Sequence, residues 1–258
     1  MIYLNDIPIN ITMFPDGTSQ VWKLDKGIEY GAWNRYSYPF HPVVRWEFSY
    51  EGEFMHLAQL SMLLRSYGYF PKLHIKYLPY GRQDKHISNH TTFALTTFAM
   101  LLNTLGFQQI TICDPHSLVA LSLINNSHAV YSITELKEAI ESTQTNMLCY
   151  PDSGAVNKYT YAYCIIELPY IYGEKEREQE TGKIINYNLM GDPSGKNVLI
   201  VDDICDGGMT FKLLTAKLLT AGASKVNLFV THGIFSKGLK TLYESGIERI
   251  FTQDGEVQ

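Results

Sequence analysis

Two adjacent carboxylates followed by a glycine-containing turn are the most informative chemical feature of the sequence. Asp202 and Asp203 end a hydrophobic run, and Gly207 and Gly208 precede a helical pattern that starts near Thr210. A turn whose N–H groups converge at a helix N-terminus binds phosphate through main-chain dipoles, without a basic side chain. Paired carboxylates beside it suit ribose hydroxyls or Mg²⁺. The segment predicts a site for a phosphorylated sugar, the structural alternative being an ordinary tight turn capped by an aspartate.

Other segments place polar residues where apolar runs end. KYLPYGRQDK (76–85) offers an arginine, whose planar paired donors suit a triphosphate, and CDPHS (113–117) offers a histidine that can bind metal or a phosphate oxygen. PDSGA (151–155) adds a carboxylate, and GEKEREQETG (173–182) reads by composition as a charged loop. Taken singly, each segment also has a purely structural interpretation. The charged segments can be solvated loops, and the histidine can be structural.

Short apolar runs alternate with helical patterns, which indicates an α/β fold with mainly parallel sheets flanked by helices. Ligands of open α/β sheets collect beyond the carboxyl ends of strands, where all the polar segments above fall. The clearest predicted strands are 73–80, 109–116, 146–154, 196–208 and 225–233. Apolar spacings of three and four predict crossover helices at 54–68, 91–107 and 210–223.

The length of 258 residues favours two domains, which we place at 1–142 and 143–258, with 132–145 as a connecting helix and linker. The formal charge of -5 gives no electrostatic footprint for duplex nucleic acid or an anionic membrane. We find neither a secretory signal nor an apolar run of the roughly 20 residues that span a bilayer. Four cysteines without a CxxC pair predict reduced, mostly buried thiols in a cytoplasmic protein.

The segment VLIVDDICDGGMTF (198–211) resembles the phosphoribosyl-diphosphate loop of type I phosphoribosyltransferases and of ribose-phosphate diphosphokinases, also called phosphoribosyl-diphosphate synthetases. The resemblance implies two tandem type I phosphoribosyltransferase-like domains, an N-terminal one on the ATP side and a C-terminal one that binds ribose phosphate. It assigns Asp202 and Asp203 to ribose hydroxyls. It assigns the 5'-phosphate to the run that follows: Asp206, Gly207, Gly208, Met209 and Thr210.

Three further matches separate synthetases from transferases. Arg82, Gln83 and Asp84 resemble the synthetases' ATP-binding Arg-Gln-Asp segment. His116 matches their Asp-Leu-His, which implies a ligand of Mg²⁺-ATP. Asp152 matches their Pro-Asp-x-Gly-Gly, which implies a second Mg²⁺-associated carboxylate that also contributes to ribose-phosphate binding, although Ala155 replaces the second glycine.

The charged segment 173–182 is similar to the synthetases' flexible basic segment, so Lys175 and Arg177 match residues that stabilise the migrating diphosphate, Arg177 also contacting ribose phosphate. A mobile lid is expected there. Phe14, Asp16 and Gly17 resemble a loop that in the family reaches the adenine site of a neighbouring subunit, which implies a homo-oligomer based on a dimer. The alternative for this loop is a plain Pro-Asp-Gly turn.

The family implies Mg²⁺-dependent transfer of the β,γ-diphosphate of ATP to the anomeric hydroxyl of a 5-phosphorylated ribose, with Lys175, Arg177 and His116 as catalytic residues. Gly207 stands where the family has a hydroxyl residue and Met209 where it has glycine. These departures raise the hypothesis of a 5'-extended acceptor such as ADP-ribose, in place of ribose 5-phosphate. Two alternatives remain: a phosphoribosyltransferase and a noncatalytic subunit associated with a synthetase.

Overall fold

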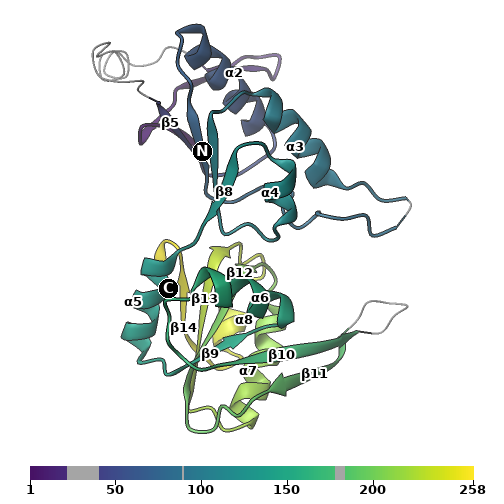
Figure 1. The fold of residues 1–258 in the computed structure, drawn as a ribbon, viewed down its shortest axis with the longest axis vertical. Helices are drawn as coiled ribbons and strands as arrows, with labels where there is room; N and C mark the ends of the chain where they lie inside the picture. Colours follow the sequence, from purple (N-terminus) through teal and green to yellow (C-terminus); the bar gives the residue numbers. More distant parts are fainter. Residues whose placement is uncertain (22–40, 89, 178–183) are drawn as a thin grey trace. The chain divides into compact units, whose positions relative to one another are not determined.

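The computed structural model describes residues 1–21, 41–88, 90–177 and 184–258 of the chain (Figure 1). It divides into two compact units, Met1–Val130 and Tyr131–Gln258. Each unit is an α/β structure built on a sheet that is mainly parallel, as the alternation of apolar runs and helical patterns predicts.

The first unit contains a six-stranded sheet in the order β2-β1-β5-β6-β7-β8. Strands β5 to β8 are parallel, whereas β1 pairs antiparallel with both β2 and β5. A separate hairpin joins β3 and β4. The strands of this unit are β1 (Ile2–Leu4), β2 (Ile7–Pro8), β3 (Ile11–Met13), β4 (Ser19–Val21), β5 (Val43–Trp46), β6 (Lys72–Ile75), β7 (Gln109–Cys113) and β8 (Ser127–Val130).

The helices of the first unit are α2 (Glu53–Ser66), α3 (Ala94–Thr104) and α4 (Val119–Leu123). All three contribute to one core with the same face of the sheet, through residues such as Leu60, Phe98 and Ala120. Along β6 the pattern alternates: Leu73 and Ile75 enter this core, while the residues between them are partly exposed. Such alternation is the pattern of a sheet whose two faces differ in burial.

The second unit contains a seven-stranded sheet in the order β11-β10-β9-β12-β13-β14-β15. Its inner strands are parallel, and β11 and β15 pair antiparallel at the edges. Strands β10 and β11 form a long ribbon that extends from the sheet (Figure 1). The strands are β9 (Met147–Tyr150), β10 (Tyr170–Arg177), β11 (Ile184–Met190), β12 (Asn197–Cys205), β13 (Lys225–Gly233), β14 (Ile247–Thr252) and β15 (Gly255–Val257).

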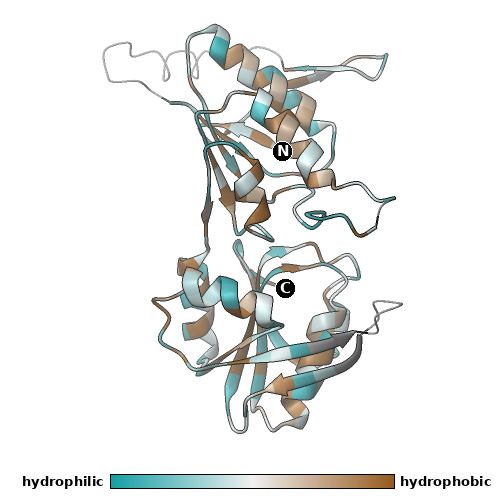
Figure 2. Ribbon diagram, turned by 45° about the vertical axis from the view of Figure 1, so that its right-hand side comes forward, coloured by the Kyte–Doolittle hydropathy of each residue, from teal (hydrophilic) through white to brown (hydrophobic). Residues whose placement is uncertain are grey.

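Helices pack against both faces of this second sheet. Val198 and Ile200 of β12 join one core with α7 (Met209–Thr220) and Leu242 of α8 (Lys240–Tyr243). Leu199 and Val201 join the other core with α5 (Ile133–Thr143) and α6 (Ser153–Ala162). A parallel strand covered on both faces must be apolar over consecutive positions. The hydrophobic residues along the strands are visible in Figure 2.

Two segments differ from the sequence-based prediction. Helix α5, which we expected within domain 1–142 and its linker, lies in the second unit, because Leu136 and Ala139 pack in a core of that unit. Residues 173–177 continue strand β10 rather than a loop, because they pair with β11; residues 178–183 lie outside the described part of the chain.

In the tyrosine-rich stretch 159–172, Tyr159 and Tyr163 pack in the core with their ring centroids 5.0 Å apart, whereas Tyr161 is exposed. Within the described ranges, no helix is long and apolar enough to cross a membrane.

Candidate active site

The two carboxylates that end the run of β12, Asp202 and Asp203, interact directly with each other. Asp203 also faces α6. Asp203 is 6% exposed, and its Oδ2 lies 3.8 Å from the Nζ of Lys158 on α6. A buried carboxylate requires such a partner, because its desolvation is costly.

The surroundings of Asp202 oppose ionisation of its carboxyl group. Burial raises its pKa well above the ordinary value of 3.8, and the neighbouring carboxylates of Asp203 and Asp152 raise it further. The backbone N–H of Asp203 donates to Asp202 Oδ1 at 3.0 Å and partly offsets this effect. Three carboxylates at the ends of the neighbouring strands β9 and β12 are therefore poised to accept hydroxyl hydrogen bonds or to attract a cation.

The turn after β12 begins α7 one residue earlier than the sequence pattern predicts, at Met209. Gly208 caps the helix at a φ of +75°, and a Cβ there would lie 2.8 Å from Leu242 Cδ2. Glycine is thus required at 208 on both conformational and steric grounds. Gly207 and Met209 are exposed and Thr210 is half-buried, so the outer edge of the loop is open to solvent.

Asp206 is held to the segment that follows β13. Its Oδ1 accepts a hydrogen bond from Ser236 Oγ at 2.5 Å. The backbone N–H groups of Ile234 and Phe235 both donate to the carbonyl of Cys205, at 2.9 and 3.1 Å. The turn after β12 and the segment 234–238 therefore form one hydrogen-bonded edge of the sheet.

Asp152 begins α6 at the end of β9. Its Oδ1 accepts a hydrogen bond from the backbone N–H of Ala155 at 3.0 Å, an N-cap that stabilises the start of the helix. Ala155 itself is buried in the core, so it packs where the family pattern has a glycine. Tyr187 of β11 fixes the preceding residue, because its hydroxyl donates to the carbonyl of Pro151 at 2.6 Å.

The two basic residues proposed to act on the diphosphate lie on the ribbon. Lys175 is paired with Tyr187 and Arg177 with Ile184 in the antiparallel register of β10 and β11. Their side chains are outside the described part of the structure.

In the first unit, two predicted ATP-side segments lie next to each other. Residues 82–84 follow β6 in a loop in which the backbone N–H of Gln83 donates to the carbonyl of Tyr80 at 2.8 Å. His116 follows β7, and a Cβ built on Gly81 would lie 3.9 Å from the His116 Cβ. Arg82, Gln83 and His116 are exposed, and Asp84 is partly buried. Neighbouring strand ends thus bring an arginine, an amide and an imidazole together.

The segment 14–18 forms the tight turn of the β3–β4 hairpin. The backbone N–H of Phe14 donates to the carbonyl of Thr18 at 2.8 Å, and Gly17 has a φ of +83°. Asp16 Oδ1 accepts from the hydroxyl and the N–H of Thr18, and these two hydrogen bonds lower the Asp16 pKa. The turn leaves Phe14 40% exposed at its tip.

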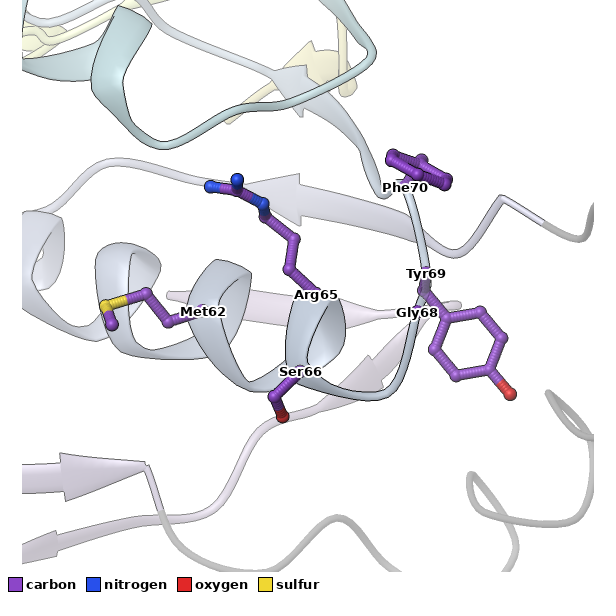
Figure 3. Close-up of a pocket in the computed structure, with 6 residues that line it drawn as sticks. All are labelled: Met62, Arg65, Ser66, Gly68, Tyr69 and Phe70. Atoms are coloured by element: carbon purple, nitrogen blue, oxygen red, sulfur yellow. The ribbon is translucent and has the colours of Figure 1, made fainter.

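Two cavities in the described part of the first unit are lined by no residue predicted for the site. One, of about 410 Å³, lies where α2 leads into β6, with Met62 and Arg65 projecting from the helix and Tyr69 and Phe70 from the following chain (Figure 3). The other, of about 380 Å³, is lined by aromatic rings and by Pro79 and Tyr80, directly before the Arg82 loop.

The donor set fits magnesium better than a softer metal. Within the described part of the chain, no three His, Cys, Asp or Glu side chains converge as a protein-only metal site. Mg²⁺ typically binds one or two carboxylates together with substrate phosphates. Asp152 raises the pKa of Asp202, and this mutual repulsion is relieved by a divalent cation. His116 and Asp152 lie in different units, and their joint role in metal binding stays a prediction.

Sequence reasoning missed two supporting residues. Lys158 pairs with Asp203 across the space between α6 and β12, and Ser236 binds Asp206. A lysine within an otherwise tyrosine-rich helix was the available signal for Lys158. Ser236 had none, because its contact joins segments far apart in the sequence. His86, a loop histidine, hydrogen-bonds through Nδ1 to the carbonyl of Thr91 at 2.8 Å.

The chain is similar to known proteins over most of its length. The family described as "Phosphoribosyl transferase domain" matches residues 155–246. A ribose-phosphate pyrophosphokinase from Saccharolobus solfataricus is 29% identical over 68% of this chain and 62% of its own length. A protein of the same name from Pyrococcus furiosus is 29% identical over 89% of this chain and 79% of its own. The chain spans 56% of the length of a relative from Schizosaccharomyces pombe, ribose-phosphate pyrophosphokinase 2.

Among solved structures, a phosphoribosylpyrophosphate synthetase from Mycobacterium smegmatis superposes with a TM-score of 0.65 at 24% identity, over 77% of this chain and 66% of that one. This match establishes the fold. The curated relatives and the matched phosphoribosyl transferase domain support the same family for this chain, that of the ribose-phosphate pyrophosphokinases.

Proposed function

We propose that this protein transfers the β,γ-diphosphate of ATP to the anomeric 1-hydroxyl of a 5-phosphorylated ribose, giving a 1-diphosphate product and AMP. The observation that carries the proposal is the end of β12, where two carboxylates precede an open turn at the N-terminus of α7. That arrangement supports binding of ribose hydroxyls by Asp202 and Asp203 and of the 5'-phosphate by the turn. The ribose-phosphate pyrophosphokinase relatives support the reaction class.

The reaction requires no covalent protein intermediate. The acceptor O1 attacks the β-phosphorus of ATP in line, the bond from that phosphorus to the α,β-bridging oxygen breaks, AMP leaves, and the hydroxyl proton is released. Arg82, Gln83, Asp84 and His116 bind and orient ATP, and Phe14, Asp16 and Gly17 contribute to the same nucleotide from a neighbouring subunit of a homo-oligomer. His116 and Asp152 would each bind Mg²⁺, which would supply charge neutralisation. Lys175 and Arg177 stabilise the charge on the migrating group.

The acceptor is ribose 5-phosphate or a 5'-extended ribose such as ADP-ribose. Gly207 offers no hydroxyl to a terminal phosphate, and Met209 is 63% exposed at the first position of α7. Both features favour a loop that is open at its outer edge, which supports the extended acceptor. Product formation from ADP-ribose would give this cytoplasmic enzyme a place in nucleotide and NAD synthesis.

Mass spectrometry of products from ATP, Mg²⁺ and each acceptor tests the proposal. We expect equal amounts of AMP and a 1-diphosphate product, formed without a nucleobase. A phosphoribosyltransferase would form no AMP under these conditions, and a noncatalytic subunit would form neither product.

Lys175→Ala should lower kcat by about 100-fold or more, because it removes a cation from the developing phosphoryl charge. The matched control is Lys225→Ala, which removes an exposed lysine of the same sheet that pairs with Glu248 at 3.5 Å. Unchanged activity of Lys175→Ala would contradict the mechanism.

A further inference from the structure

The 5'-phosphate turn has a lysine at its outer edge that the family motifs did not identify. Lys237 is exposed, and its Cγ lies 3.7 Å from the position of a Cβ on Gly207. No carboxylate within the described residues forms an ion pair with it, whereas Lys240, three positions later, pairs with Glu244 at 3.8 Å.

The backbone holds Lys237 in this place. The N–H of Gly238 donates to the carbonyl of Phe235 at 2.8 Å, so Lys237 is the third residue of a tight turn. Phe235 and Gly238 have φ values of +47° and +73°. The Ser236–Asp206 hydrogen bond, at 2.5 Å, joins this turn to the loop after β12. The lysine stem is therefore positioned beside Gly207.

The two glycines of the loop then have separate roles. Gly208 is buried against Leu242 and starts the helix, whose N-terminal N–H groups would bind the 5'-phosphate under the proposed function. Gly207 is exposed, and only the lysine stem lies within 4 Å of its Cβ position. The three bonds from Cγ to Nζ allow the ammonium group to reach around this outer edge, where a second phosphoryl group attached to the first would extend.

We propose that Lys237 is a specificity-determining residue that binds the second phosphoryl group of an acceptor whose ribose carries a 5'-diphosphate linkage. The inference rests on the proposed function for the location of the 5'-phosphate. Lys237 adds a cation to a loop that otherwise binds phosphate through main-chain donors. Hydrogen bonds between charged partners are stronger than those between neutral ones.

Isothermal titration of the full chain with ADP-ribose and with ribose 5-phosphate, without ATP, tests this assignment. Lys237→Ala should raise the Kd for ADP-ribose about tenfold or more and the Kd for ribose 5-phosphate by less than about threefold. Lys237→Arg should restore most of the ADP-ribose affinity, because it keeps the charge. Lys240→Ala is the control and should change neither Kd.

Gly207→Ser provides a second test from the opposite side of the contact. The position leaves ordinary van der Waals room for a Cβ, so the variant should fold, and its hydroxyl should favour the monophosphate over the diphosphate. Equal losses for both ligands in Lys237→Ala, no loss for either, or failure of the wild-type chain to bind ADP-ribose would overturn the inference. Because binding is measured without ATP, each of these outcomes is distinguishable from a failure of diphosphoryl transfer.

Discussion

Strands β6 and β13 are both inner strands of a parallel sheet, yet their side chains meet different surroundings. In β13 the consecutive residues 226–232 are all buried, whereas in β6 the buried Leu73 and Ile75 alternate with partly exposed residues. Polar groups in the first sheet therefore remain partly hydrated. In the second sheet the polar residues Asn227 and Thr231 of β13 are buried. The sheet covered on both faces thus removes the polar groups of its inner strand more completely from water.

Alanine substitutions at adjacent positions provide the strongest test of this difference. Leu228→Ala and Phe229→Ala in β13 should each lower the free energy of unfolding by about 2–5 kcal/mol, because each leaves a cavity in a different core. In β6, Leu73→Ala should cost a similar amount, but His74→Ala about 1 kcal/mol or less. Urea unfolding measures all four. A large loss for His74→Ala would show that both faces of β6 are buried in solution.

The same difference explains which elements could be predicted from the sequence. The consecutive apolar residues of β12 and β13 and the helix after them have strong local signals, and both strands occur where predicted. The charged composition of 173–177 predicted a loop, and this was wrong. The strand conformation of the segment comes from pairing with β11, which lies beyond it in the sequence. The position of α5 likewise depends on its burial against strands that follow it.

For part of the site the sequence predicts which residues take part but not which of them are in contact. The adjacency of His116 to the Arg82 loop follows from the parallel order of β6 and β7. The contact of Lys158 with Asp203 and that of Lys237 with Gly207 depend on the exact packing of a helix and a turn against β12. Periodicity gives no information about such contacts.

Glu53 in the first unit and Asp202 in the second should change the stability of the protein with pH in opposite directions. Burial alone would raise its pKa, but hydrogen bonds from the N-terminal ammonium group, Trp46 Nε1 and the Ser49 N–H outweigh burial and lower the pKa below 4.5. A lowered pKa contributes stability above the ordinary value that is lost as the pH falls through the folded-state pKa.

Glu53→Gln should therefore cost about 1–3 kcal/mol at pH 7, since an amide group cannot accept from all these donors. The difference from wild type should shrink below pH 4.5, the ordinary value of the carboxyl. Urea titrations at several pH values measure it. A cost that is independent of pH would mean that shape, and not charge, is what Glu53 contributes.

The contribution of Asp202 to stability should change with pH in the opposite direction to that of Glu53. Its pKa is raised, so the folded state binds the proton more tightly than the unfolded state, and stability falls as the pH rises from 3.8 through the raised value. Asp202→Asn removes this loss and should be more stable than wild type at pH 8, by up to about 1.4 kcal/mol per pH unit crossed. The measurement requires EDTA and no nucleotide, since bound Mg²⁺ would hide the repulsion. An Asp202→Asn variant that is less stable than wild type at pH 8 would contradict a raised pKa for Asp202.

The smallest changes in stability should come from two surface arginines, one in each unit, that each contact a carboxylate and an aromatic ring. Arg249 makes paired hydrogen bonds of 2.7 and 2.6 Å to Glu256 and lies 4.8 Å from the Phe251 ring. Arg45 pairs with Asp6 at 3.2 Å and lies 3.9 Å from the Tyr3 ring. Exposed ion pairs typically contribute about 0–1 kcal/mol, and the bidentate geometry places Arg249 toward the upper end.

Arg249→Ala should accordingly cost about 0.5–1 kcal/mol, and Arg249→Lys nearly as much, because lysine keeps the charge but not the paired donors. Arg45→Ala should cost less, because its two carboxylate partners, Asp6 and Glu47, do not offer one matched fork. Urea unfolding at low and high NaCl separates the two contributions. Charge attraction is screened by salt, whereas the contact of each guanidinium with its aromatic ring persists. If Arg45→Ala is the more costly change at high salt, the closer ring contact, and not carboxylate geometry, determines which arginine stabilises its unit more.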